Sequence, residues 1–322
     1  MIYPKYLKKL IVGFLVLFLC GCQKTDSVMK VYDPSSQQSE FSCFEATDLS
    51  IAASFASNLC VVSEDNLASA SLTAEAASIY NITDQINLYS KNVHARMNPA
   101  SITKVMTVLI ALEYGHMDDI VTITEEAMIS ESGATLLDLH PGDQITVENL
   151  IKASMVKSAN DAASALAISI GESLEGFVDM MNQKALEIGA TNTHFSNPHG
   201  LTDEEHYTTA YDLYLILNEA SNNQTFLDLI QMKEAEIVYM DEAGNPKSVK
   251  VTNSNRFVNG SVEPPEGVIV VGGKTGTTNA AGSCLAILSK NAVGKWFCSV
   301  ILKADSSETL FQEMNTLLEL EN

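Results

Sequence analysis

At residues 98–104 the chain reads Asn98-Pro99-Ala100-Ser101-Ile102-Thr103-Lys104. Proline suits the first turn of a helix, and the apolar residues that follow recur at the spacing of one buried helical face: Ile102, Val105, Met106, Leu109 and Ile110. Ser101 and Lys104 share another face of this helix, which places their Cβ atoms roughly 5–6 Å apart. The stretch therefore predicts a helix that starts with a hydroxyl beside an amine, which is the arrangement of an activated serine.

Two further short motifs follow in order along the chain. Ser158-Ala159-Asn160 comes after a stretch with helical periodicity, and Lys274-Thr275-Gly276-Thr277 comes after Gly272-Gly273 and an apolar run. An S-x-x-K motif on its own is common by chance. The ordered set S-x-x-K, S-x-N and K-T-G is typical of serine enzymes that react with penicillin. The three motifs together predict one catalytic site.

The first motif supplies a nucleophile and its base. Ser101 is a poor nucleophile at its normal pKa and needs a base within hydrogen-bond reach. Lys104 fills this role only as a neutral amine, so its pKa must fall from about 10.4 toward the working pH. Burial and a second cation across the cleft, Lys274, both lower that pKa. We expect the backbone amides of Ser101 and Thr277 to stabilise the oxyanion that forms during attack.

The other two motifs are expected to move a proton and to bind the substrate. Ser158 is positioned to pass a proton to the leaving amine, and Asn160 to orient both Lys104 and the substrate amide. The ammonium and hydroxyl groups of the third motif are expected to hold a substrate carboxylate: Lys274, Thr275 and Thr277. Gly276 keeps the strand edge clear, so that an extended peptide can lie along it.

The first 21 residues have the pattern of a lipoprotein-type signal peptide. Three lysines precede the apolar run Leu10–Leu19, which is too short to span a bilayer as a stable helix. The following Leu19-Cys20-Gly21-Cys22 resembles a bacterial lipobox, in which Cys22 becomes the lipidated first residue of the mature chain. An ordinary signal peptide cut nearby and an uncleaved anchor are the alternatives, and both also export the chain.

Composition restricts the partners of the exported chain. Residues 22–70 are predicted to form a polar tether and pre-domain segment, because Gln23–Ser42 is rich in Ser, Gln, Asp and Lys. The formal net charge of the 322 residues is −21, and it becomes −24 when the three lysines of the signal are removed. Such a charge argues against nucleic acid or anionic lipid as a partner. A lipid-anchored chain of this kind is expected on the outer face of the bacterial cytoplasmic membrane.

The cysteines and histidines form no metal-binding or redox motif. Neither C-x-x-C nor H-E-x-x-H is present, so we expect no metal and no other cofactor. Export permits disulfides, and Cys43 with Cys60 is a possible bridge ahead of the catalytic domain. Cys284 and Cys298 lie on successive apolar stretches, where buried thiols are the favoured state.

Predicted strands lie at both ends of the domain and predicted helices in its middle. The strands are Ala77–Tyr80, Ile86–Tyr89, Val268–Gly273, Ser283–Ser289 and Trp296–Lys303. The helices that follow the nucleophile helix are Val147–Lys157, Asp161–Ile170, Glu172–Ile188, Thr209–Ala220 and Glu308–Leu320. Because the terminal strands must meet in one antiparallel sheet, we predict an α+β protein with Ser101 between that sheet and a helical region that carries Ser158.

Residues 75–320 resemble the D-alanyl-D-alanine carboxypeptidases, the low-molecular-mass penicillin-binding proteins. Beyond the three motifs, the likeness extends to Asn98-Pro99-Ala100 and to four further stretches: residues 160–163, 190–195, 197–201 and 207–213. The resemblance implies a β-lactamase/transpeptidase-like fold for a catalytic domain at residues 71–322. It also implies a serine-type hydrolase of peptidoglycan synthesis, which removes the terminal D-alanine from stem pentapeptides through an acyl-enzyme on Ser101 and which β-lactams acylate.

The chain departs from that family's pattern in two ways. Position 159 is Ala where the family usually has Gly, and a positive φ there would cost on the order of 1 kcal/mol. The sequence also ends 48 residues after Lys274, so we expect no C-terminal β-domain and an N-terminal lipid in place of the membrane helix of many members. Arg256 is a further candidate for binding the substrate carboxylate, in uncertain register.

Three rival functions share most of these residues. A class A β-lactamase would need a carboxylate that activates water, and no E-x-x-L-N segment lies between Ser158 and Lys274. A D,D-endopeptidase or transpeptidase would use the same motifs with another acceptor or peptide bond. A non-catalytic penicillin-binding lipoprotein, acting in sensing or cell-shape control, would have no need of the complete set of motif residues.

Overall fold

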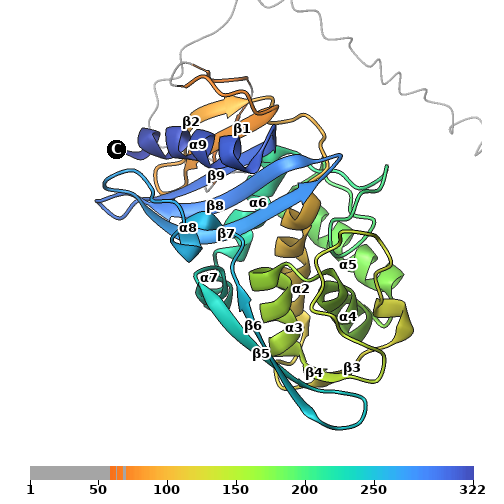
Figure 1. Ribbon diagram of the computed structural model, residues 1–322. Helices are drawn as coiled ribbons and strands as arrows, with labels where there is room; N and C mark the ends of the chain where they lie inside the picture. Colours follow the sequence, from red (N-terminus) through yellow and green to blue (C-terminus); the bar gives the residue numbers. More distant parts are fainter. Residues whose placement is uncertain (1–58, 63, 68–69) are drawn as a thin grey trace, which may run out of the picture. The chain divides into compact units, whose positions relative to one another are not determined.

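The computed structural model describes residues 59–62, 64–67 and 70–322 (Figure 1). The predicted signal peptide at 1–21, the predicted lipidation site Cys22, and Cys43 lie outside the described residues. Cys60 is buried, and its backbone amide donates a hydrogen bond of 3.0 Å to the hydroxyl of Tyr214. Contact with the folded domain therefore begins before residue 71, and the pairing of Cys60 with Cys43 stays a prediction.

A five-stranded antiparallel sheet joins the two ends of the domain. Its strands lie in the order β2-β1-β9-β8-β7 and have these bounds: β1 Ala76–Asn81, β2 Ile86–Lys91, β7 Ile269–Thr278, β8 Gly282–Lys290 and β9 Trp296–Ala304. The N-terminal hairpin pairs with β9, so that Ala77 lies opposite Ile301. The prediction that the terminal strands meet in one sheet is confirmed. Strand β7, which carries the K-T-G motif, lies at the edge.

Both faces of this sheet are covered. Alternate side chains of β8 point to opposite sides: Leu285 and Ile287 join the cluster under the C-terminal helix α9 (Ser307–Leu318), while Ala286 and Leu288 join the larger core on the helical side. Figure 1 shows α9 lying across the sheet. Cys284 and Cys298 are buried free thiols on the helical side, as predicted, and burial raises the pKa of Cys284 to about 11.

The helical region packs against the other side of the sheet. Its helices are α2 Lys104–Tyr114, α3 Val147–Lys152, α4 Asn160–Gly171, α5 Leu174–Ile188, α6 Ala210–Ala220 and α7 Gln224–Ile230. A π-helical turn, Ala153–Lys157, links α3 to α4. Helix α2 contacts α4, α5 and α6 and is buried on every side from Lys104 to Ala111. The sequence predicted one buried face for α2, but all of its faces are buried, because this helix forms the centre of the core.

A second antiparallel sheet, absent from the sequence prediction, lies at the far end of the helical region. Its strands are β3 Ile120–Thr122, β4 Gln144–Thr146, β5 Glu234–Met240 and β6 Pro246–Thr252, in the order β3-β4-β5-β6. The first two strands have three residues each, which is too short to give a period-2 pattern. Strands β3 and β4 could not be predicted from the sequence for this reason.

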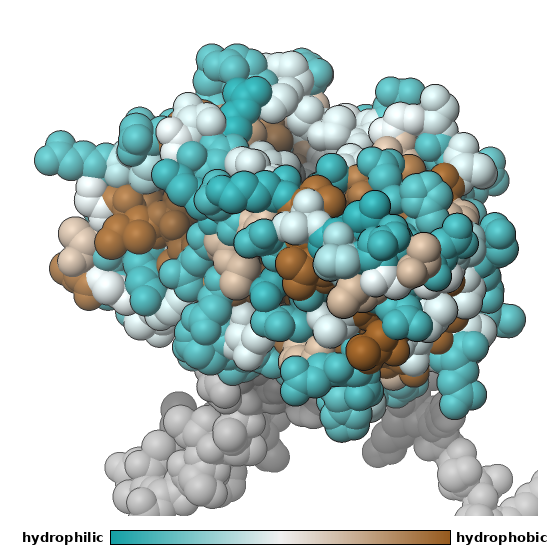
Figure 2. All heavy atoms as spheres, turned by 60° about the horizontal axis from the view of Figure 1, so that its bottom comes forward, coloured by the Kyte–Doolittle hydropathy of each residue, from teal (hydrophilic) through white to brown (hydrophobic). Residues whose placement is uncertain are grey.

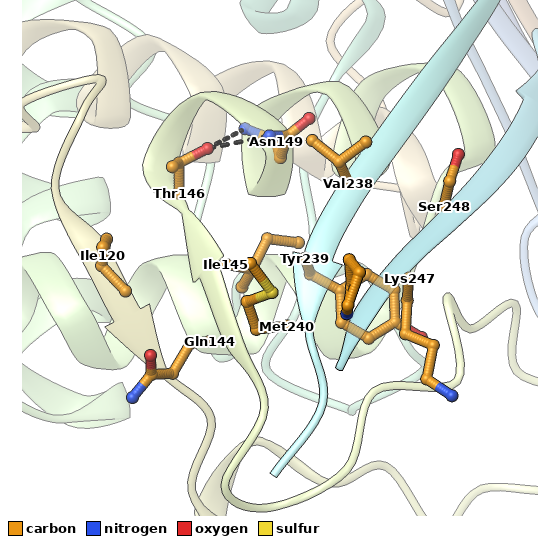
Figure 3. Close-up of a pocket in the computed structure, with 11 residues that line it drawn as sticks. Ile120, Gln144, Ile145, Thr146, Asn149, Val238, Tyr239, Met240, Lys247 and Ser248 are labelled. Atoms are coloured by element: carbon orange, nitrogen blue, oxygen red, sulfur yellow. Dashed lines mark hydrogen bonds between the residues drawn. The ribbon is translucent and has the colours of Figure 1, made fainter. Parts of the chain in front are cut away.

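The surface is largely hydrophilic on the face shown in Figure 2, with separate apolar patches. Three exposed apolar residues belong to the second sheet, Ile120, Val238 and Met240. Together with Ile145 they surround a shallow hollow over that sheet (Figure 3). No helix in the described part of the chain is long and apolar enough to cross a membrane.

Candidate active site

The nucleophile motif begins in a 3-10 turn rather than in the α-helix itself. The turn spans Ala100–Thr103, and α2 follows directly from Lys104. Ser101 therefore lies on the tighter turn, and Lys104 is the first α-helical residue. Ser101 Oγ and Lys104 Nζ are 3.1 Å apart. The predicted contact between hydroxyl and amine is present, although no side-chain cap is formed at the start of either helix.

Lys104 is completely buried, and its hydrogen bonds suit a neutral amine. Nζ lies 2.6 Å from Asn160 Oδ1 and 2.7 Å from the backbone oxygen of His199. A neutral amine has two hydrogens, which these two oxygens accept, and one lone pair, which is left for the hydroxyl proton of Ser101. Burial lowers the pKa of Lys104 well below its ordinary value, and the nearby charge of Lys274 lowers this pKa further.

Ser158 and Lys274 form a second buried pair across the cleft. Lys274 Nζ lies 2.9 Å from Ser158 Oγ and 3.0 Å from the backbone oxygen of Thr275. Burial lowers the pKa of Lys274 to about 7. Ser158 adopts a left-handed conformation with φ of 67°, whereas Ala159 has φ of −66°. The strained residue of this motif is therefore the serine, and Ala159 carries no penalty from a positive φ.

A buried carboxylate fixes the loop that faces the nucleophile. Asp161 accepts hydrogen bonds from the backbone amides of Leu137 and Leu139 at 2.9 and 3.1 Å, and the amide of Asn160 donates to the oxygen of Thr135 at 2.8 Å. These bonds tie residues 135–139 to the start of α4. In the sequence, Asp161 stands out only as part of the family resemblance, since its partners are backbone groups.

The edge strand β7 lies close to the nucleophile. A Cβ on Gly276 would lie 2.8 Å from the oxygen of Pro99 and 2.9 Å from the nitrogen of Ser101, so only glycine permits this approach. Thr277 lines the same cleft of about 610 Å³ as Ser101. The hydroxyl of Thr275 is 2.5 Å from Ser254 Oγ, a neighbour that sequence reasoning missed.

The cleft is lined by one acidic side chain and by no basic side chain among the described residues. Arg256 pairs with Glu308 at 3.0 Å and stacks on Phe311. It is not among the residues that line the cleft, so the structure does not support Arg256 as a ligand of the substrate carboxylate. Glu131 is the charged residue among those that line the cleft next to Ser101. Among the described residues of the site, the positive charge for a substrate therefore comes from the buried Lys274.

Solved structures share this architecture. The DD-transpeptidase of Streptomyces K15 superposes with a TM-score of 0.72 and 25% identity, covering 78% of this chain and 98% of that chain. The D-alanyl-D-alanine carboxypeptidase DacD from Francisella tularensis gives a TM-score of 0.68 and 28% identity, covering 80% of this chain and 73% of that chain. The predicted α+β, β-lactamase/transpeptidase-like fold of penicillin-binding D,D-peptidases is confirmed.

The chain belongs to the D-alanyl-D-alanine carboxypeptidase family, whose model matches residues 62–306. It is 38% identical to the D-alanyl-D-alanine carboxypeptidase DacF of Bacillus subtilis over 208 residues, which are 63% of this chain and 50% of that protein. It is 32% identical to DacC of Escherichia coli over 236 residues, which are 70% of this chain and 56% of that protein. The chain thus spans about half the length of these relatives.

Proposed function

We propose that this protein is a serine-type D-Ala-D-Ala carboxypeptidase, which removes the terminal D-alanine from peptidoglycan stem pentapeptides. The observation that carries the proposal is the contact of 3.1 Å between Ser101 Oγ and the fully buried amine of Lys104. A neutral amine beside a serine hydroxyl acts as a general base for nucleophilic attack. Membership of the carboxypeptidase family supports the choice of peptide bond.

Acylation begins when Ser101 Oγ attacks the carbonyl carbon of the penultimate D-alanine and Lys104 takes the hydroxyl proton. The amides of Ser101 and Thr277 stabilise the oxyanion of the tetrahedral intermediate. The bond from carbon to nitrogen then breaks, and the proton that Lys104 took passes through Ser158 to the nitrogen of the leaving D-alanine, which leaves Lys104 neutral again. An ester on Ser101 and free D-alanine result. With a β-lactam, the same attack opens the four-membered ring and leaves a penicilloyl ester on Ser101.

Deacylation repeats these steps with water as the nucleophile. Lys104 takes a proton from the water, the same two amides hold the second oxyanion, and Ser101 leaves with its proton restored. The shortened stem peptide is released. An amine of a second stem peptide in place of water would give transpeptidation, so the acceptor is an outcome to be measured.

The terminal carboxylate of the substrate is held at the β7 side of the cleft. Lys274 supplies the positive charge from below, and Thr277 offers an exposed hydroxyl beside Ser101. The hydroxyl of Thr275 is hydrogen bonded to Ser254, and the residues that line the cleft beside Ser101 include Thr277 but not Thr275. Hydroxyls backed by a buried cation can bind a small carboxylate without the side-chain entropy cost of an exposed lysine.

The N-terminal segment supports a second part of the proposal, on location. Residues 1–21 are a lipoprotein-type signal, Cys22 carries the lipid, and residues 22–70 are the tether and pre-domain segment that link it to the catalytic domain on the outer face of the cytoplasmic membrane. The basic start, the short apolar run and the lipobox support this reading. Substituting Cys22→Ser should abolish incorporation of labelled palmitate, and unchanged labelling would remove the assignment.

The full chain can be tested for the proposed activity with two measurements in parallel. Intact-protein mass spectrometry after incubation with benzylpenicillin detects a penicilloyl adduct, and free D-alanine is measured with a muramyl pentapeptide. A persistent adduct on Ser101 together with D-alanine release supports the carboxypeptidase. Rapid loss of the adduct with hydrolysed drug would instead identify a β-lactamase. An adduct without D-alanine release would leave a penicillin-binding protein or a different peptide bond.

Lys274 gives the reaction a predicted alkaline limit. Its pKa of about 7 means that the free enzyme loses this positive charge as the pH rises through neutrality, and the substrate carboxylate then loses its partner. We expect kcat/KM for D-alanine release to fall above about pH 7, because this ratio reports groups of the free enzyme. Lys274→Arg keeps the charge at all these pH values and should flatten the alkaline side of the profile. A parental profile that is level to pH 9 would contradict the assignment.

A further inference from the structure

Ala100, the residue before the nucleophile, has an unfavourable backbone conformation. Its φ of 47° lies in the left-handed region, which a non-glycine residue occupies only where its surroundings hold it there. The carbonyl of Ala100 and the N–H of Ser101 belong to the same planar trans peptide, so they point in opposite directions. Whatever holds the Ala100 carbonyl therefore also determines where the Ser101 N–H points.

A chain of two hydrogen bonds ends on that carbonyl. Thr103 Oγ1 donates to the oxygen of Ala100 at 2.8 Å, and His206 Nε2 lies 2.8 Å from the same Thr103 Oγ1. The other ring nitrogen, His206 Nδ1, accepts from the backbone amide of Ser196 at 3.0 Å. Thr103 and His206 are both almost completely buried, at 1% exposure each.

These contacts determine the direction of each bond. Because Nδ1 of His206 accepts a backbone N–H, it carries no proton in the neutral ring, and the proton is on Nε2. Nε2 therefore donates to Thr103, whose own hydroxyl hydrogen is directed to the Ala100 carbonyl. Burial lowers the pKa of His206 to about 4, which keeps the ring neutral at ordinary pH. Phe195 packs against the ring with centroids 5.7 Å apart and keeps its plane in place.

Two glycines leave room for this peptide on its two sides. A Cβ on Gly200, which has φ of 86°, would lie 1.9 Å from the oxygen of Ala100 and 2.8 Å from Thr103 Oγ1. On the opposite side, Gly276 of β7 approaches the nitrogen of Ser101. The carbonyl therefore faces the loop that contains Gly200 and His206, and the N–H faces the cleft beside β7.

We propose that Thr103 and His206 are positioning residues, which hold the Ala100–Ser101 peptide so that the Ser101 N–H points at the oxyanion. The proposal rests on the proposed acyl-enzyme chemistry and deepens it. Neither side chain touches the substrate. Both acylation and deacylation pass through an oxyanion at the same amide, so a misdirected N–H slows both steps, while initial binding of the substrate changes little.

The plain alternative is that Thr103 only satisfies a helix terminus, since threonine often bonds a carbonyl three residues earlier in its own helix. The chain contains a control for the loss of a buried threonine hydroxyl on the same helix. Thr107 lies one turn further along α2, is equally buried, and donates from its hydroxyl to the backbone oxygen of Pro198 at 2.6 Å. The Thr107 hydroxyl thus also donates to a backbone oxygen, but in a distant segment, and it makes no hydrogen bond to the Ala100–Ser101 peptide.

The test compares Thr103→Val, Thr103→Ser and Thr107→Val in the full chain. We expect Thr103→Val to slow acylation by benzylpenicillin and hydrolysis of the penicilloyl ester by about 10- to 100-fold each. Thr103→Ser and Thr107→Val should stay within about 3-fold of the parent. The ester carbonyl stretch, measured by infrared difference spectroscopy with labelled drug, should move to higher frequency in Thr103→Val, because its oxygen has lost a hydrogen bond.

Each other result argues against the proposal. Rates of Thr103→Val that match those of Thr107→Val, slowing without a shift of the carbonyl band, or failure of serine to rescue would each overturn it. If Thr103→Val does not fold, His206→Leu against His206→Gln decides the question, since Gln keeps an N–H near the position of Nε2. A parent protein that forms no penicilloyl adduct would remove the proposed function itself, and this is evident before any variant is made.

Discussion

Ser101→Ala is expected to form no penicilloyl adduct and to release D-alanine at least about 10⁴-fold more slowly than the parent protein. The substitution removes the only atom that forms the covalent bond in the proposed mechanism. The rest of the site is expected to stay in place, because Ser101 is partly exposed and the one hydrogen bond of its hydroxyl within the described residues is with Lys104 Nζ. Noncovalent binding of the substrate should therefore persist.

Intact-protein mass spectrometry and D-alanine release measure this prediction, with thermal unfolding as a check on the fold. Ser132→Ala is a suitable control, because Ser132 lines the same cleft, whereas the amine of Lys104 is hydrogen bonded to Ser101, Asn160 and His199 instead. This control should be acylated at the parental rate. An adduct that still forms on the Ser101→Ala protein would place the nucleophile elsewhere, and full activity of that protein would favour a different catalytic mechanism.

The site could be predicted from the sequence where local spacing determines contact. Ser101 and Lys104 meet because residues three apart on a helical turn are neighbours, and this holds for a 3-10 turn as well as for an α-helix. The apolar strands β8 and β9 were also predictable, since buried strands of nine residues give strong hydrophobic signals, whereas only the first three residues of β7 are apolar. Short strands with polar residues, such as β3 and β4, give no such signal.

Contacts between distant segments were beyond reach of these local patterns. The bond between His206 and Thr103 joins residues 103 positions apart, and Asp161 is held by backbone amides that leave no mark in the sequence. The positive φ of Ser158 is equally hidden, since serine has no special preference for that region. These features depend on the tertiary structure. The family resemblance therefore identified the segments that contain these residues, but it gave no physical role for the individual side chains.

Lys104→Met tests the base directly, and its expected effect is the second largest. Methionine fills a similar volume without an amine, so no group is left to accept the proton of Ser101. We expect acylation by benzylpenicillin to slow by about 10³- to 10⁴-fold. Lys152→Met, on a lysine that makes a surface ion pair with Glu148, should leave the rate unchanged. Parental acylation of the Lys104→Met protein would eliminate the proposed base.

The same variant also tests why Lys104 is neutral, through the pH dependence of stability. The pKa of Lys104 is lowered in the folded protein, so between that pKa and the ordinary value of about 10.4 the unfolded chain binds more protons than the folded one. Lys104 therefore contributes a rise with pH to the free energy of unfolding of the parent across this window. Lys104→Met lacks this contribution, so chemical denaturation at pH 6, 8 and 9.5 should give a shallower rise for the variant. Equal slopes would mean that Lys104 stays protonated in the folded protein, and a protonated lysine has no lone pair with which to activate Ser101.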